Sequence, residues 1–301
     1  MDTLYGCDAF TPSDIARRVS ELGVAKTRIP LLSLVMLGML AGAFIGLGAI
    51  FNVVVLSDAS MPIGARRVVG GMVFSLGLFL VLVAGAELFT GNNLLAMAWA
   101  ERKVTTGAVL RNWAIVCTAN FAGALGLAGL VFLSGHPAND GGAVAATYMK
   151  LAAAKTALPW TKAFFSGVMC NVLVCTAVWV ALAGHSVTDK LLAIVLPIAA
   201  FVAAGFEHSI ANMYIIPLGM MLAWDAGQPV QLAGLWHNLV PVIAGNLVGG
   251  SVLVALVYHV IYVRPRKVQA GANEAPPAIE AAPGPAAPVA GDYASEPAGH
   301  R

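Results

Sequence analysis

The chain has 301 residues, of which 59% are hydrophobic and only 11% are charged, and its net charge at pH 7 is +2. A soluble domain typically carries about 25% charged residues, so this composition excludes an ordinary water-soluble globule and indicates a membrane protein. The small net charge gives no indication of a nucleic-acid partner. The four cysteines show no metal-binding or redox spacing, and the sequence indicates no cofactor and no metal site.

Residues 1–29 form a polar N-terminal segment that contains an amphipathic stretch. Pro12, Ser13 and Asp14 are typical of a helix start, and apolar residues follow at helical spacing. The pattern predicts a helix that lies in the membrane interface on the cytoplasmic side.

Six apolar segments follow, each close to the roughly 20 residues that a helix needs to cross a bilayer. They cover residues 31–56, 68–100, 109–133, 163–182, 191–222 and 239–263. Polar residues interrupt the second and the fifth segment. We therefore expect an all-α membrane protein with a channel domain at 30–265. Residues 266–301 are rich in Ala, Pro and Gly and are expected to be a disordered cytoplasmic tail.

The basic residues predict the orientation in the membrane, because cytoplasmic loops carry an excess of Lys and Arg. With the N-terminus inside, twelve of the seventeen Lys and Arg residues lie on the inner side. An even number of spans then places the C-terminus on the same side. We expect a multi-pass protein of the plasma membrane with both termini in the cytoplasm.

The two halves of the chain share polar residues at constant separations. The second and fifth segments match 120 residues apart, through Gly85, Glu87 and Asn92 and through Gly205, Glu207 and Asn212. The third and sixth match 126 residues apart, through Asn112, Asn120 and Gly123 and through Asn238, Asn246 and Gly249. Because three spans are repeated once, the copies have opposite orientations, as in the inverted repeats of many transporters. The alternative is a chance match, since Gly and Asn are common in membrane helices.

Both interrupted segments carry their polar insert at the same place within the repeat. Unwound backbone at membrane depth is tolerated only where it is buried in protein or lines a cavity. Paired breaks of this kind indicate a transport site near the midplane. The sequence therefore predicts the site at the two inserts, 87–93 and 207–212.

Four motifs resemble the formate/nitrite transporter family over roughly residues 10–265. They are AELFTGNN at 86–93, CNVLVC at 170–175, GFEHSIANM at 205–213 and GNLVG at 245–249. The resemblance implies an aquaporin-like homopentamer with one pore per protomer and with broken second and fifth helices. It implies pathway residues at Thr90, Lys155, Asn171 and His208. It also implies apolar constrictions at Phe74, Leu78, Leu88, Phe89, Val174 and Phe201.

His208 is the main candidate for contact with a substrate, because an ionisable residue inside a membrane indicates function. Histidine can donate a hydrogen bond to an anion and can exchange a proton near neutral pH. The alternative is an inert, hydrogen-bonded histidine. Thr90 offers a second hydroxyl donor, or it only caps the half-helix that follows. Asn171 is expected to orient the His208 ring, or to form a hydrogen bond between helices.

The charged residues near the inserts have different expected roles. Lys155 matches the family at the outer side and is expected to collect anions there. Glu87 and Glu207 would repel an anion, so we expect them to be structural and to bind backbone N–H groups of the opposite broken helix. Asn92 and Asn212 belong to the same structural set of polar residues in the broken helices.

The sequence thus predicts transport of a small monovalent anion, with formate favoured over nitrite and hydrosulfide less favoured. An apolar constriction opposes a bare anion far more than a neutral acid. Two mechanisms stay open: simple anion channelling, and passage with a proton acquired near His208. A haem-bearing respiratory subunit is an alternative from another class, but it needs paired axial histidines. A neutral-solute channel is a further alternative, although paired Asn-Pro-Ala loops are absent from the sequence.

Overall fold

The computed structural model of the chain describes residues 9–264, and every regular element in this range is a helix. The predicted tail at 266–301 and the first eight residues of the N-terminal segment lie outside the described part. The long helices are α1 Pro12–Thr27, α2 Leu31–Ser57, α3 Ile63–Leu80, α6 Thr106–Leu133, α7 Ala143–Thr156, α8 Trp160–Ala181, α9 Val187–Ala204, α10 Ser209–Asp225 and α11 Ala233–Leu247. The short helices are α4 Phe89–Asn92, α5 Leu95–Ala100, η2 His136–Ala138 and η3 Asp140–Gly142. Three segments are π-helical: η1 Val81–Gly85, η4 Val248–Leu256 and η5 His259–Val263.

Six helices in the described part of the chain are long and apolar enough to cross a membrane. They cover Leu31–Ser57, Ile63–Gly85, Thr106–Leu133, Trp160–Ala181, Val187–Ala204 and Ala233–Val263. Each overlaps one of the six predicted segments, which confirms an all-α, multi-pass membrane protein. The second helix starts five residues before the predicted residue 68, because the two arginines there lie within its first turns.

The second and fifth predicted segments are both broken, and the two breaks have the same geometry. Residues 86–88 and 206–208 have no helical structure. Each break follows a glycine in the left-handed region, Gly85 at φ 88° and Gly205 at φ 77°. Only glycine adopts this backbone without a steric cost. The chain resumes as α4 and α5 after the first break, and as one helix, α10, after the second.

Glycines let neighbouring helices approach backbone to backbone in each half. At Gly42 in α2 and Gly123 in α6, an added Cβ would collide with a main-chain carbonyl of the other helix. Gly245 in α11 and Gly249 in η4 meet main-chain carbonyls of α8 in the same way. Small residues at such crossings are typical of helix packing in membranes.

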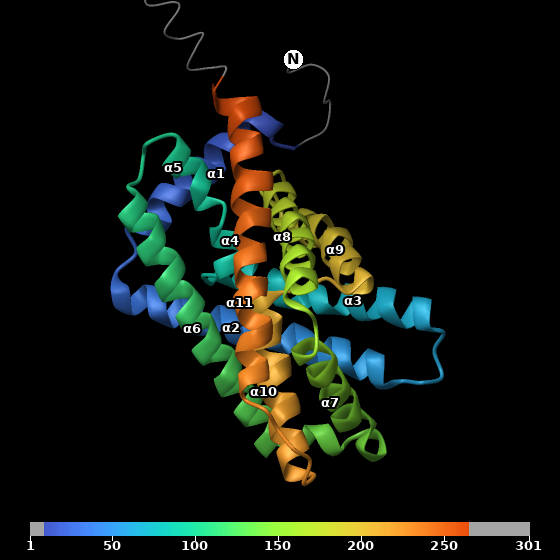
Figure 1. Cartoon of the computed structure of the whole chain (residues 1–301). Helices are drawn as coiled ribbons and strands as arrows, with labels where there is room; N and C mark the ends of the chain where they lie inside the picture. The colour runs from blue at the N-terminus through green and yellow to red at the C-terminus, as the bar shows by residue number, and fades with distance from the viewer. Residues whose placement is uncertain (1–8, 265–301) are drawn as a thin grey trace, which may run out of the picture.

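Two further helices lie at opposite ends of the molecule. The predicted amphipathic helix is present as α1, which packs against α5 and η5. Helix α7 packs against α10, and no part of the sequence analysis predicts it. Figure 1 shows α1 and α5 at one end and α7 at the other. The two ends of the described chain lie together at the α1 end (Figure 1).

Candidate functional site

Thr90 and His208 meet at the centre of the molecule, although 118 residues separate them in the sequence. Thr90 Oγ1 lies 3.1 Å from His208 Nε2. Thr90 belongs to the single turn of α4, directly after the first break, and His208 is the last residue of the second break and the N-cap of α10. Both side chains are buried. The two breaks therefore bring these two predicted pathway residues together.

The hydrogen bonds of His208 define which ring nitrogen carries the proton. Nδ1 accepts a hydrogen bond from the Ala211 backbone N–H at 3.1 Å, so Nδ1 has no proton of its own. A neutral imidazole then carries its proton on Nε2. Nε2–H donates to Thr90 Oγ1, and the Thr90 hydroxyl keeps its own proton for another acceptor. The pair thus offers one free polar hydrogen, that of the Thr90 hydroxyl, at a buried position.

A network of four side chains holds the first break. Lys26 Nζ, from α1, donates to Glu87 Oε1 at 2.6 Å and to Asn92 Oδ1 at 3.0 Å. Asn92 Nδ2 donates to Glu87 Oε2 at 2.7 Å and to Asn112 Oδ1 at 3.0 Å. Asn112 Nδ2 donates back to the Lys26 carbonyl at 3.3 Å. The pairing lets a carboxylate lie within the protein, because a partner offsets the cost of burying its charge.

The second break has the matching network. Lys155 Nζ, from α7, donates to Glu207 Oε1 at 2.8 Å. Asn212 Nδ2 donates to Glu207 Oε2 at 2.6 Å and to Asn238 Oδ1 at 2.7 Å. Asn238 Nδ2 donates to the Lys155 carbonyl at 3.0 Å. Lys26 and Lys155 are 129 residues apart, the separation that also relates Gly38 to Gly167.

These networks correct the expectation from the sequence about the two carboxylates. The donors to both carboxylates are lysine and asparagine side chains, whereas backbone N–H donors were expected. Lys26 is an important residue that sequence reasoning missed, because a lysine on an amphipathic helix is usually a solvated charge. The sequence signal that could have identified Lys26 is its separation of 129 residues from Lys155, the same separation that relates Gly38 to Gly167.

Asn120 and Asn246 satisfy backbone groups at the breaks. Asn120 Nδ2 donates to the carbonyls of Gly38 and Glu87, at 2.7 and 2.9 Å, and its Oδ1 accepts from Phe89 N at 2.9 Å. Asn246 makes the three corresponding bonds with Gly167 O, Glu207 O and Ser209 N, at 2.8, 3.1 and 3.0 Å.

Asn171 lies beside the central pair but does not bind the histidine ring as expected. Its Nδ2 donates to the Thr90 carbonyl at 3.2 Å, to Asn93 Oδ1 at 2.7 Å and to the Asn246 carbonyl at 2.7 Å. The physical reason is that a buried backbone carbonyl without a donor costs free energy, whereas both ring nitrogens of His208 already have partners. Asn171 thus contacts the site through the Thr90 backbone.

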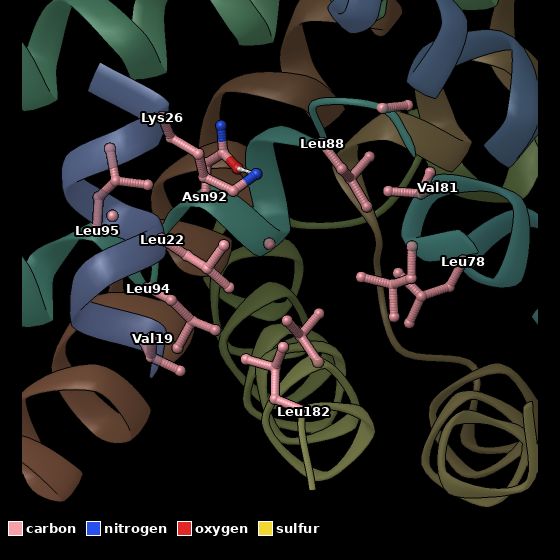
Figure 2. A pocket seen from close by; sticks show the side chains of 15 residues that line it. Val19, Leu22, Lys26, Leu78, Val81, Leu88, Asn92, Leu94, Leu95 and Leu182 are labelled. Carbon is pink, nitrogen blue, oxygen red and sulfur yellow. Dashed lines mark hydrogen bonds between the residues drawn. The ribbon is translucent and has the colours of Figure 1, made fainter. Parts of the chain in front are cut away.

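A cavity of about 100 Å³ lies on the α1 side of the central pair. Figure 2 shows Lys26 beside Asn92 on one side of this cavity, with Leu88, Val81 and Leu78 on the other. The predicted constriction residues Leu78 and Leu88 belong to its lining. Apolar side chains form most of the wall, together with Val178 and Leu182 of α8, which the sequence analysis did not single out.

The other predicted constriction residues are all buried, and one of them contacts the His208 ring. Phe201 stacks on the His208 ring at 5.8 Å between ring centroids and meets Phe74 edge to face at 5.8 Å. Phe89 and Val174 are buried in the same apolar cluster. The central pair therefore lies among apolar side chains, an arrangement that can hold a small anion by hydrogen bonds while excluding water.

The fold and this site define a channel-like membrane protein with a buried polar centre at two broken helices. Residues 13–260 match the family model described as formate/nitrite transporter. The chain is 37% identical over 273 residues to the formate channel FocA of Escherichia coli strain K12, with 85% of this chain and 96% of FocA covered. The chain belongs to the formate/nitrite transporter family.

Two solved structures have the same fold. A pentameric formate channel with formate bound is 35% identical, with a TM-score of 0.71, and the match covers 77% of this chain and 97% of that one. An ion channel of the same family is 31% identical, with a TM-score of 0.74, and the match covers 82% of this chain and 98% of that one.

Proposed function

We propose that this protein carries formate across the plasma membrane through the Thr90–His208 site, with nitrite as a second substrate. The observation that carries the proposal is the 3.1 Å contact between Thr90 Oγ1 and His208 Nε2, buried between the two breaks. The similarity to formate channels supports formate as the first choice. Both anions are small and monovalent and offer two oxygen atoms, so either can accept from the Thr90 hydroxyl and also from the His208 Nε2–H when it displaces the bond to Thr90 Oγ1.

His208 acts in this proposal as a neutral hydrogen-bond donor. A second proton on the ring has to enter at Nδ1, which already accepts the Ala211 N–H. Protonation therefore costs the N-cap hydrogen bond of α10 in addition to the cost of a buried charge. This geometry favours a neutral His208 that passes the anion by hydrogen bonding. It disfavours a His208 that carries a positive charge before the anion arrives.

Proton-coupled passage is the second mechanism, and the apolar walls favour it. Leu78, Leu88 and Phe201 oppose a bare anion more than a neutral acid. In this version, formate gains a proton before it enters the constriction. Lys26 and Lys155 form ion pairs with Glu87 and Glu207, so they offer the anion hydrogen-bond donors and no excess of positive charge. The cavity beside Lys26 supports such a contact on the α1 side.

We also propose a homopentamer with inverted halves and both termini in the cytoplasm. The pentameric formate channel with the same fold supports the assembly. The paired breaks and the matching Lys–Glu–Asn–Asn networks support the repeat. The excess of basic residues on one side supports the orientation, together with the shared position of the two ends of the described chain.

Uptake of labelled formate into proteoliposomes tests the function. The wild-type protein is expected to show saturable uptake that excess nitrite suppresses. Thr90→Val, which removes the hydroxyl and keeps the shape, is expected to reduce uptake strongly. Thr176→Val is the matched control, because the Thr176 hydroxyl bonds only to its own helix in the described chain, at Val172 O. No uptake above empty liposomes contradicts the proposal.

A membrane potential separates the two mechanisms in the same vesicles. Passage of the anion alone moves charge, so an inside-positive potential is expected to accelerate uptake. Passage of one anion with one proton moves no net charge and acidifies the interior without responding to the potential. A potassium gradient with valinomycin sets the potential, and a trapped pH dye reports the proton.

A further inference from the structure

The backbone carbonyl of Thr90 lies at a point where the helix cannot supply a donor. In a continuous α-helix the Leu94 N–H would bond to the Thr90 carbonyl. Helix α4 has only four residues and ends before α5 begins, and the Leu94 N–H bonds to the Gly91 carbonyl instead, at 3.2 Å. A buried carbonyl without a partner is costly at membrane depth, so other groups have to bind it.

Two side chains of α8 provide those donors. Asn171 Nδ2 and Cys175 Sγ each lie 3.2 Å from the Thr90 carbonyl oxygen. The two residues are four apart, so they share one face of α8. The resemblance to the family implies a pathway role for Asn171 and none for Cys175.

The position of the Cys175 thiol is closed on its other side by the π-helical segment η4. Cys175 is completely buried, and a Cβ added to Gly250 of η4 would lie 2.7 Å from its sulfur. The glycine thus permits η4 to press against the thiol. The sulfur is confined between η4 and the Thr90 carbonyl, which leaves its S–H little freedom to find another acceptor.

We propose that Cys175 is a positioning residue of the transport site, whose S–H bond to the Thr90 carbonyl sets where the Thr90 hydroxyl meets His208. Carbonyl and hydroxyl belong to the same residue, so a donor that fixes the Thr90 peptide also fixes the direction of its side chain. The effect on transport rests on the proposed function, whereas the S–H bond itself does not.

The second break shows why this donor is needed only once. The residue 129 positions before Cys175 is Gly46, which has no side chain to donate. The residue that corresponds to Thr90 is Ile210, and it lies inside the continuous helix α10. A carbonyl in the first turns of a continuous helix receives an N–H from the helix itself. The thiol therefore serves the one break whose following helix is a single turn.

The S–H stretching band of the purified protein tests the hydrogen bond without any transport assay. A hydrogen-bonded S–H absorbs at lower frequency than a free one. Cys170→Ala is the matched control, because Cys170 is equally buried on α8 and is not among the donors to Thr90 in the described chain. The band lost in Cys175→Ala is expected at lower frequency than the band lost in Cys170→Ala. Loss of a band at the free-thiol frequency overturns the proposal.

Formate uptake tests the positioning role. Removing one donor is expected to raise the half-saturating formate concentration of Cys175→Ala by about threefold to tenfold, with less change in the maximal rate. Cys175→Ser retains an O–H donor and is expected to stay close to the wild type, as is Cys170→Ala. Equal effects of the Ser and Ala variants indicate packing alone and overturn the proposal. If the wild-type protein itself takes up no formate, the proposed function fails. The S–H band then still shows whether the bond from Cys175 to the Thr90 carbonyl exists.

Discussion

Two networks, one around Glu87 and one around Glu207, hold the two breaks with the same residue types and nearly the same bonds. The residues at the centre of the molecule, where the two breaks meet, differ. Lys26 binds both Glu87 and Asn92, whereas Lys155 binds Glu207, and Asn212 Oδ1 accepts no hydrogen bond within residues 9–264. At the centre the two halves differ more. Leu88 in the first half corresponds to His208 in the second, and Thr90 corresponds to Ile210.

This difference separates the residues that hold the fold from the residues that form the site. The residues that both halves share bind unwound backbone and each other. The residues that only one half has, Thr90 and His208, present hydrogens to the interior. A symmetric scaffold thus carries an asymmetric site, and substitutions at corresponding positions can measure each part.

The largest expected effect on stability is the loss of a paired carboxylate. Glu207→Ala leaves the Lys155 charge without its partner and is expected to lower the free energy of unfolding by about 3–5 kcal/mol. Glu87→Ala is expected to cost less, because the Lys26 side chain is 27% exposed against 16% for Lys155 and reaches water more easily. Unfolding of the purified protein in mixed detergent measures both.

A double variant serves as the control for this prediction. Lys155→Met combined with Glu207→Gln removes both charges and is expected to recover part of the loss. A larger loss for Glu87→Ala than for Glu207→Ala would contradict the role of burial in the comparison.

Next in size are the asparagines that bridge the breaks. Asn120→Leu and Asn246→Leu each leave three backbone groups without their partner, and each is expected to cost about 2–4 kcal/mol. The two losses should be equal if the halves are held in the same way. Asn52→Leu is the control, because Asn52 Nδ2 is buried without a partner in the described chain. Clearly unequal losses at positions 120 and 246 would contradict a shared scaffold.

The left-handed glycines before the breaks should have smaller and again equal effects. Gly85→Ala and Gly205→Ala meet open space, so their cost is the backbone strain alone, about 1–2 kcal/mol each. Gly107→Ala, also in open space but inside helix α6, is expected to cost nothing. Thermal unfolding followed by circular dichroism compares the three variants. No loss at either break would show that the φ values do not constrain the residue there.

The smallest effects are expected in the connections α2–α3 and α8–α9. Ser186 caps α9 in a capping box with Asp189, and Ser186→Ala is expected to cost about 1 kcal/mol. In the other connection, hydrogen bonds from Ser60 hold the pKa of Asp58 below its usual range. The stabilisation from Asp58 is therefore present at neutral pH and is lost only as the pH falls through that lowered pKa.

The matching variant, Ser60→Ala, is expected to raise the pKa of Asp58 and to lose its small stabilisation at neutral pH, which water screens because Asp58 is fully exposed. Carboxyl titration by NMR follows the pKa. A loss at Ser60 as large as that at Ser186 would contradict the difference between the two connections.

Much of this arrangement could be predicted from the sequence. Apolar length gave the six spans, and the repeated Gly, Glu and Asn gave the places of both breaks. The contact between Thr90 and His208 was not predicted from spacing, because it depends on where two distant breaks meet. The resemblance to the family supplied those two residues as pathway candidates.

The rest depends on tertiary contacts that no local pattern shows. In the sequence Lys26 has the pattern of a solvated interfacial lysine, and only the structure shows that Glu87 lies beside it. Helix α7 is rich in alanine and has few large apolar residues, so its sequence shows neither a span nor an amphipathic face. The Cys175 thiol can bind the Thr90 carbonyl only because α4 ends after one turn. The carbonyl then has no donor in its own helix and accepts from side chains of α8.

The most direct test of the Thr90–His208 site is formate uptake by His208→Leu, which gives the second break the residue found at position 88 in the first. Leu88→Ile, measured beside it, controls for a change of apolar packing at the corresponding position. We predict that His208→Leu lowers saturable uptake by at least about tenfold, the loss expected when a buried donor to an anion is removed, and that Leu88→Ile retains it. Wild-type uptake by a correctly assembled His208→Leu protein would contradict the assignment of the site.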